Sequence, residues 1–162
     1  MNSLQIRPAR PDDAAAACGV LRSSIAELCA VDHGNDPKFL AAWLASKTAE
    51  NVAAWIADPG NVFYVADDGG RIAGAAAMNK SELITLNYVS PDARFKGISK
   101  SLLAALERKA AAMGLTRCML ESTKTARHFY QMAGYRETEG VACGVCRPMV
   151  KDLAEPENPK AR

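Results

Sequence analysis

The sequence predicts an α/β protein with one domain. The chain has 162 residues, and a domain of this length buries roughly 70% of the surface of its unfolded chain, so it needs neither disulfides nor metal to fold. Strand-like and helix-like segments alternate, and Val89–Leu103 runs from an apolar strand through a basic turn into an amphipathic helix. The hydrophobic fraction of 49% and the charged fraction of 23% are ordinary for a soluble protein.

The first third of the chain is predicted to be mainly helical. A short strand is stopped by Pro8, an alanine-rich helix begins at Pro11, and the segment Val31–Pro37 forms a loop. Trp43 and Trp55 stand at helical positions in apolar surroundings and are expected in the core. The expected elements are a strand at residues 4–7 and helices at residues 11–29, about 39–44, and 49–57.

The remaining two thirds alternate strands with helices. Asp67-Asp68-Gly69-Gly70 is a strong hairpin signal between two strands. Gly114 and Gly134 are suited to end the two later helices. The expected strands are residues 62–66, 71–78, 82–89, 117–121, 135–138 and 144–150, with helices at about 98–113 and from Ser122 or Thr123 to Ala133. Residues 1–154 form the expected domain, and residues 155–162 are expected to be a mobile tail.

The charge of the chain restricts its partners. A formal net charge of +2 is too small to attract nucleic acid or membrane over the whole surface. No stretch approaches the ~20 apolar residues of a membrane span, and the first residues lack the apolar run of a signal peptide. We therefore expect a cytoplasmic protein without nucleic-acid or membrane partners, in which any anion site is local.

The cysteines indicate neither a disulfide framework nor a metal site. Their number, five, is odd. Cys143 and Cys146 form a lone Cys-x-x-Cys pair, but the only histidines, His33 and His128, stand in no metal-like spacing with it. We interpret the pair as coincidental and expect no metal.

The turn before the predicted helix at residue 98 has the features of a phosphate site. Gly97 allows close approach of the backbone, and the first N–H groups of the helix lack internal partners and carry the positive end of its dipole. Arg94, Lys96 and Lys100 add positive charge. The alternative is an ordinary glycine-containing turn with solvated lysines.

Two sequence blocks, separated by one predicted strand, make the interpretation more specific. The first is Arg94-Phe95-Lys96-Gly97-Ile98-Ser99, and the second runs from Ala126 to Tyr135 with the pair Phe129-Tyr130 and Gly134 inside it. They resemble the acetyl-CoA pyrophosphate loop and the Ala-x-x-Phe-Tyr-x-x-x-Gly-Phe/Tyr block of the GCN5-related N-acetyltransferase (GNAT) family. Ser99 stands where that family has Gly or Ala, and Thr123 stands where it often has Asn.

This resemblance implies a fold and a cofactor. The fold is a mixed, mostly antiparallel sheet of six or seven strands with helices on both faces, and the cofactor is acetyl-CoA. Backbone N–H groups of Phe95–Ser99 would hold its pyrophosphate, and the strand Leu86–Val89 would bend at a bulge and pair with its pantetheine arm. The implied cofactor-binding residues are Asn87, Tyr88, Val89, Arg94, Phe95, Lys96, Gly97, Ile98, Ser99, Thr123 and Tyr130.

The same resemblance implies transfer of acetyl to a primary amine of a small molecule or peptide by direct attack. Tyr130 is the expected catalytic acid, because a phenol with a pKa near ~10 is protonated at neutral pH and can donate to a departing thiolate. An alkyl amine is only about one part in a thousand neutral at pH 7, so a base is also needed. Glu121, near the expected cleft, is the chosen candidate, and Glu82 at the start of the neighbouring strand and His33 in the acidic loop are the alternatives. The alternative for Tyr130 is a core tyrosine.

The acceptor site is expected near the loop between the first helices. His33 and Asp36 are the candidate substrate-binding residues, and the acidic loop would suit a cationic substrate. For these two residues and Glu121, the alternative is a surface or capping role. Two other functions stay open, namely a non-catalytic acyl-CoA-binding regulator and a general small-anion binder. The sequence is compatible with a homodimer and does not identify the acceptor.

Overall fold

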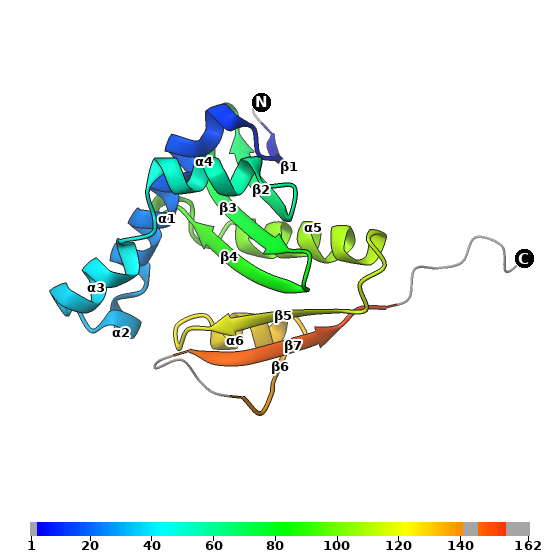
Figure 1. Cartoon of the computed structure of the whole chain (residues 1–162). Helices are drawn as coiled ribbons and strands as arrows, with labels where there is room; N and C mark the ends of the chain where they lie inside the picture. The colour runs from blue at the N-terminus through cyan, green and yellow to red at the C-terminus, as the bar shows by residue number, and fades with distance from the viewer. Residues whose placement is uncertain (1–2, 141–145, 155–162) are drawn as a thin grey trace, which may run out of the picture.

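A single twisted sheet organises the protein (Figure 1). The computed structural model describes residues 3–140 and 146–154. Within them, seven strands lie in the order β1-β2-β3-β4-β5-β7-β6, and every neighbouring pair is antiparallel except β4 and β5. The strands are β1 (Leu4–Pro8), β2 (Asn61–Asp68), β3 (Arg71–Asn79), β4 (Leu83–Val89), β5 (Arg117–Ser122), β6 (Arg136–Glu137) and β7 (Arg147–Asp152). The predicted mixed, mostly antiparallel sheet is confirmed.

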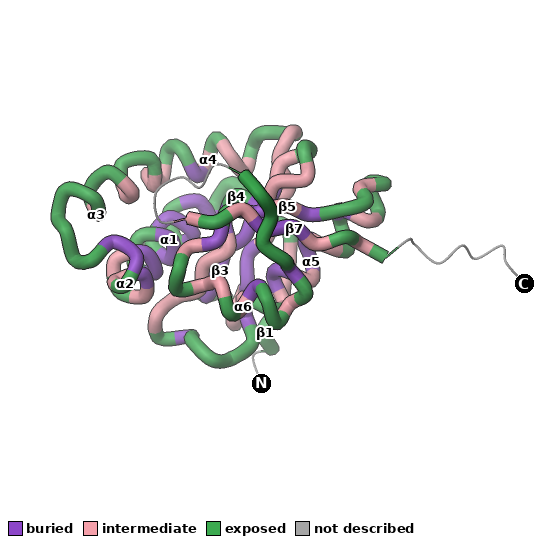
Figure 2. The backbone as a smooth tube through the Cα atoms, turned by 90° about the horizontal axis from the view of Figure 1, so that it is seen from below, coloured by how far each residue is buried: buried purple, intermediate pink, exposed green. Residues whose placement is uncertain are grey.

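Helices cover both faces of this sheet. The α-helices are α1 (Ala14–Leu28), α2 (Ala30–His33), α3 (Pro37–Leu44), α4 (Ala49–Ala57), α5 (Ile98–Ala112) and α6 (Arg127–Met132), with 3₁₀ turns at Pro11–Asp13 and Pro91–Ala93. Buried residues of α1 and α4 share one core with one face of β2 and β3, whereas α5 and Tyr130 of α6 belong to the core on the other face. Helix α3 has no buried residue and lies at the edge of the molecule (Figure 2).

Three of the differences from the predicted boundaries have a physical reason in the structure. The segment 31–33 belongs to the short helix α2, which Gly34 ends in the left-handed conformation, so the predicted loop there is wrong in its first half. Pro8 is the last residue of β1 rather than a stop, because an edge strand needs no N–H from a terminal proline. Helix α6 begins only at Arg127, because the chain makes a turn in which Ala126 N donates to Thr123 Oγ1 at 3.3 Å.

Some predicted features lie partly or wholly outside the described residues. The last strand begins at Arg147, and positions 144 and 145 of its predicted range are not described. The same holds for Cys143 and for the tail after residue 154. In the described part, no helix has the length and apolar character needed to cross a bilayer, and no three His, Cys, Asp or Glu side chains are grouped as metal ligands.

Small residues in β3 let helices pack closely on both sides of the sheet. Ala75 and Ala77 face the α1 side, and Ala73 and Ala76 face the α5 side. Gly74 lies directly under the start of α5. A Cβ atom there would be 2.8 Å from Ile98 Cγ2, 2.9 Å from Leu102 Cδ1 and 3.2 Å from the carbonyl oxygen of Tyr88. Because glycine has no side chain, the first turn of α5 can approach the sheet closely at Gly74.

We predict that Gly74→Ala destabilises the protein. The added methyl group overpacks the contact with Ile98 and Leu102, which typically lowers the free energy of unfolding by about 1–3 kcal/mol. Urea-induced unfolding measures this change. Gly19→Ala is the matched control, because a Cβ at Gly19 in α1 would meet no atom within 4 Å, and alanine in a helix is more stable than glycine by roughly 1 kcal/mol. Equal effects of both variants would contradict the proposed packing.

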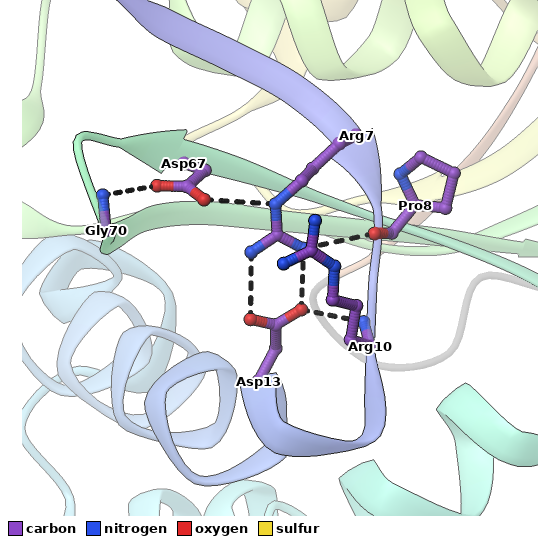
Figure 3. A network of polar contacts seen from close by, with 6 residues as sticks. All are labelled: Arg7, Pro8, Arg10, Asp13, Asp67 and Gly70. Carbon is purple, nitrogen blue, oxygen red and sulfur yellow. Dashed lines mark hydrogen bonds and ion pairs between the residues drawn. The ribbon is translucent and has the colours of Figure 1, made fainter. Parts of the chain in front are cut away.

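A partly buried polar network joins the N-terminal strand to the rest of the domain (Figure 3). Arg7 donates from Nη1 and Nη2 to the two carboxylate oxygens of Asp13, at 2.8 and 3.0 Å, and from Nε to Asp67 Oδ2 at 3.0 Å. Asp13 Oδ2 also accepts from Arg10 N, and Asp67 Oδ1 accepts from Gly70 N in the hairpin. The hydrogen bonds to Arg7, above all, hold the pKa of the Asp13 carboxyl below its usual value. The network therefore connects β1, the start of α1 and the β2–β3 hairpin.

We predict that Asp13→Asn lowers stability and flattens its pH dependence. Loss of the charged hydrogen bonds with Arg7 lowers the free energy of unfolding by about 2 kcal/mol at neutral pH. Because the folded pKa of Asp13 lies below the unfolded value of about 3.9, its stabilisation is present above that pH and is lost as the pH falls through the folded pKa. Urea unfolding between neutral pH and pH 3 measures both effects. The exposed neighbour Asp12 supplies the control Asp12→Asn, and a decline in acid equal to that of the parent protein would contradict this role of Asp13.

Candidate active site

The two parallel strands at the centre of the sheet separate soon after they begin. Strands β4 and β5 pair only at Leu83 with Met119 and at Ile84 with Leu120. The register between β3 and β4 shifts there, since Ala77 pairs with Leu86 and Met78 with Ile84, which leaves Thr85 as an extra residue. The bulge thus lies at Thr85, one residue before the segment in which we expected it. Bulges increase local twist and bend a strand.

Beyond the bulge, one edge of β4 is left without a strand partner. From Leu86 to Val89 the strand pairs with β3, but in the described part of the chain no strand pairs with its other edge. Free N–H and C=O groups at a strand edge are a template for another extended segment. The side chain of Val89 packs against the core on the α5 side, so only its backbone is available to a ligand.

A cavity of about 120 Å³ occupies the space between the separated strands. Its walls come from β4, the end of β5, the β5–α6 turn, α6 and the end of α1. The lining residues are Leu28, Cys29, Ile84, Thr85, Leu86, Asn87, Tyr88, Leu120, Glu121, Thr123, Thr125, Ala126 and Tyr130. The structure thus brings together five of the residues expected from sequence, namely Asn87, Tyr88, Glu121, Thr123 and Tyr130, and adds the end of α1, which the sequence did not indicate.

Tyr130 is the most buried of the titratable residues that line the cavity. It is 7% exposed, and its ring packs edge-on against Phe129 and Tyr135, at 5.1 and 5.6 Å between ring centres. Burial raises the pKa of its phenol to about 12, and the amide of Asn87 partly opposes this shift. The phenol is therefore protonated at neutral pH, and Tyr130 lines the cavity.

The amide of Asn87 is buried and forms no hydrogen bond of normal geometry with a described residue, although it lies close enough to the Tyr130 phenol to oppose part of the rise in the pKa of that group. In the described structure neither Oδ1 nor Nδ2 forms a hydrogen bond of normal geometry, and both atoms are inaccessible to solvent. An unpaired buried amide is costly, because each group has lost its bonds to water. Such an amide beside the unpaired edge of β4 fits a ligand that carries amide groups of its own.

Tyr88 and Glu121 line the same cavity but differ in their exposure to solvent, since Tyr88 is partly buried and Glu121 is exposed. Burial raises the pKa of Tyr88, and the indole of Trp43 opposes the shift, so this phenol too is protonated. Glu121 is exposed at the end of β5 while still lining the cavity. A carboxylate that is both solvated and at the cavity can exchange protons with water.

The turn before α5 presents unpaired positive charge and free N–H groups. Phe95 and Gly97 adopt positive φ angles of 62° and 75°, and no side chain caps the first turn of the helix. The side chains of Arg94 and Lys96 are exposed and form no ion pair with a described residue; Arg94 lies over the ring of Phe95, 4.5 Å from its centre. Ile98 is buried in the core, so this residue can offer a ligand only its backbone.

The two expected acceptor residues lie elsewhere. His33 is 3% exposed; its Nε2 contacts the carbonyl of Ile25 at 3.1 Å, and its Nδ1 accepts from Asn35 N. Asp36 caps α3 by accepting from Lys38 N at 2.9 Å. Neither residue lines any of the three cavities of about 120, 300 and 460 Å³ in the described part of the chain. Through these hydrogen bonds, both side chains stabilise the connection between α1 and α3, which agrees with the surface or capping role that the sequence left open.

Comparison with known proteins identifies the family. The sequence profile of the acetyltransferase (GNAT) domain matches residues 30–145. The chain belongs to the GNAT family. Comparison with curated protein sequences gives no significant match.

Solved structures share the GNAT fold over nearly the whole chain. A GCN5-related N-acetyltransferase from Rhodopseudomonas palustris is 26% identical, with a TM-score of 0.82 over 94% of this chain and 98% of that one. The PaiA N-acetyltransferase of Thermoplasma acidophilum, solved with coenzyme A, is 18% identical, with a TM-score of 0.80 over 93% and 99%. YncA of Salmonella typhimurium, solved with its cofactor acetyl-CoA, is 19% identical, with a TM-score of 0.71 over 99% of both chains.

We predict that Asn87→Leu keeps or raises the stability of this GNAT protein while it weakens cofactor binding. Leucine removes two buried polar atoms that lack partners, and such a replacement is neutral or stabilising. Thermal unfolding with and without coenzyme A measures both effects: the unfolding temperature of the free protein should not fall, and the shift caused by coenzyme A should shrink.

Asn79→Leu is the matched control for stability. The Oδ1 atom of Asn79 accepts from Ser81 N and Leu83 N, so its loss should destabilise the protein. If Asn87→Leu were as destabilising as Asn79→Leu, the amide of Asn87 would have partners in solution.

Proposed function

We propose that the protein is an N-acetyltransferase that moves acetyl from acetyl-CoA to a primary amine of a small molecule or peptide by direct attack. The observation that carries this proposal is the buried phenol of Tyr130 at a cavity that the unpaired edge of β4 also lines. When bound, acetyl-CoA would supply the activated thioester. The chain must then hold the cofactor, orient the acceptor amine and manage two protons.

Two parts of the chain fit the cofactor. The N–H groups at the start of α5, with Arg94 and Lys96, are suited to the pyrophosphate, since helix N-termini and unpaired cations both favour phosphate. The free edge of β4 from Leu86 to Val89 and the unpaired amide of Asn87 are suited to the amide-containing pantetheine arm. The turn and the cavity lie at the two ends of this strand edge.

Tyr130 would stabilise the leaving thiolate. Its pKa of about 12 lies well above that of an ordinary thiol, near ~8.5, so hydrogen-bond donation is favoured over complete proton transfer. This donation lowers the free energy of the thiolate as the bond to sulfur breaks. Thr123 Oγ1 accepts from Ala126 N within its own turn, and the Thr123 carbonyl accepts from Ser122 Oγ, so Thr123 would contribute to the cofactor site by donating from its hydroxyl.

Glu121 would take the proton of the acceptor ammonium, directly or through a water molecule, and, after passing it to solvent, would take the second proton that the nitrogen loses as the amide forms. It is exposed at the cavity and forms no ion pair with a described residue. A carboxylate in this position can accept a proton and pass it to solvent.

The experiment that tests the function measures thermal stability and then turnover. Acetyl-CoA at 100 times its dissociation constant should add about 2.7 kcal/mol to the stability, and pyrophosphate alone should add less. Thiol release should then depend on added amine. A protein that binds acetyl-CoA but releases no thiol with any amine would be a non-catalytic acyl-CoA-binding regulator. Equal effects of pyrophosphate and acetyl-CoA would indicate a small-anion binder.

We predict that Tyr130→Phe lowers kcat by 10²–10⁴-fold, the range typical for loss of a catalytic proton donor. The dissociation constant of acetyl-CoA should change little, because phenylalanine keeps the ring contacts with Phe129 and Tyr135. Tyr64→Phe is the control, because it removes the same hydroxyl group from a partly buried tyrosine of β2. Unchanged turnover in Tyr130→Phe would remove Tyr130 from the mechanism.

A further inference from the structure

A second cavity adjoins the candidate active site. It has a volume of about 300 Å³ and lies on the face of the sheet that α1 and α4 cover. Lys47, Trp55, Asn61 and Asn79 line it, and it shares Thr85 and Leu86 with the cavity between β4 and β5. The two cavities thus share a wall at the bulge of β4.

The backbone of Lys47 is fixed by α1. Its N–H donates to the carbonyl of Leu44 at 3.0 Å, and its carbonyl accepts from Arg22 Nη1 at 2.9 Å and from the thiol of Cys18 at 3.3 Å. Arg22 Nη1 also donates to the carbonyl of Leu44, so one guanidinium holds both ends of this turn. The side chain of Lys47 therefore starts from a defined position at the cavity wall.

The ammonium group of Lys47 has no carboxylate partner. It donates to Ser46 Oγ at 3.1 Å and lies 5.9 Å from the centre of the Trp55 ring, while no carboxylate of a described residue is within ion-pair distance. Burial alone shifts its pKa, downward, with no opposing acidic group. A half-buried cation without a counterion gains strongly from an anionic ligand, because its own hydration is incomplete.

The other walls suit a ligand with one anionic end. The sequence suggested Trp55 as a core residue, but it is only partly buried, so the cavity gains a flat apolar wall. The carbonyl end of the Asn79 amide is occupied by Ser81 N and Leu83 N, which leaves its N–H₂ end for an acceptor group. A cation, an amide donor and an aromatic wall are features that together recognise a carboxylate on a short apolar chain.

We propose that this cavity binds the carboxylate of the acceptor, so that the protein acetylates small amines that carry a carboxylate at the far end of a short apolar linker. The proposal rests on the proposed acetyl transfer, since the amine must reach the cavity between β4 and β5. Thr85 and Leu86 line both cavities, so an acceptor that binds in both would lie across these two residues. Lys47 then selects the substrate without touching the atoms that react.

Binding of carboxylates tests the site without any turnover. Butyrate, valerate and caproate, with their uncharged carboxamides for comparison, would be titrated calorimetrically into the parent protein and into Lys47→Gln, Lys47→Arg and Lys109→Gln. The exposed Lys109 lies on α5, on the opposite face of the sheet, so its variant controls for net charge. We expect carboxylates to bind at least tenfold more tightly than carboxamides, with this preference lost in Lys47→Gln, partly kept in Lys47→Arg and unchanged in Lys109→Gln. An equal preference in Lys47→Gln and the parent would overturn the proposal.

Kinetics separate this proposal from the proposed function. With γ-aminobutyrate, δ-aminovalerate and ε-aminocaproate as acceptors, kcat/KM should exceed that of the matching carboxamides by about tenfold, and Lys47→Gln should remove the difference mainly through KM. Acetylation of both series at equal rates would refute carboxylate recognition while acetyl transfer stands. Carboxylate binding that depends on Lys47, without acetylation of any amine, would refute the acetyltransferase instead. Thermal unfolding of each variant confirms that it is folded.

Discussion

The early separation of β4 from β5 is the constraint on which the rest of the structure depends. Parallel pairing ends after two residue pairs, at Ile84 and Leu120, because the extra residue Thr85 bends β4 away. A central sheet that opens in this way exposes backbone hydrogen-bonding groups that neighbouring strands would otherwise satisfy. The cavity, the orphaned amide of Asn87 and the available edge of β4 are all consequences of this opening.

Contacts on both sides of the opening hold the two halves of the sheet together. On one face, Glu107 of α5 accepts from Tyr135 Oη at 3.0 Å and from Lys151 Nζ at 2.9 Å, so the helix that packs on β3 and β4 is also tied to β7. At the mouth of the cavity, Asp32 of α2 accepts from Thr125 N at 3.0 Å. These hydrogen bonds connect the two halves of the sheet where β4 and β5 no longer pair.

The positively charged side chains of the turn before α5 and of the cavity at Lys47 differ in their exposure to solvent. The turn before α5 places Arg94 and Lys96 in solvent, where screening is strong and many anions can approach. Lys47 is half-buried in a cavity of limited volume, where shape restricts which anions can enter. If the first end holds the cofactor and the second holds the acceptor, the protein uses a general anion site for the common substrate and a selective one for the variable substrate.

Local sequence patterns determined the elements and the parts of the site that consist of backbone. The hairpin at Asp67–Gly70, the strands on either side of it and the helix from Ile98 follow from alternation, helical spacing and glycine. The turn Arg94–Ser99 and the pair Phe129-Tyr130 were recognisable for the same reason, since each lies in one continuous segment whose conformation depends on its own residues. The bulge was expected close to its position, although Thr85 itself carries no signal.

Only the tertiary structure decided which side chains meet. The sequence could not show that His33 bonds to the backbone of α1, because its partner, the carbonyl of Ile25, is presented by the packing of α2 on α1. Nor could it show that Lys47 and Trp55, on the α3–α4 turn and on α4, would form one wall of a cavity with Asn79 of β3. Such groupings depend on distances between segments far apart in the chain, and these distances are set by helix packing on the sheet rather than by local conformational preference. The sequence therefore determined the family and the turn Arg94–Ser99 that is proposed to hold the cofactor, while the packing of α1–α4 on the sheet determined the shape and charge of the proposed acceptor site.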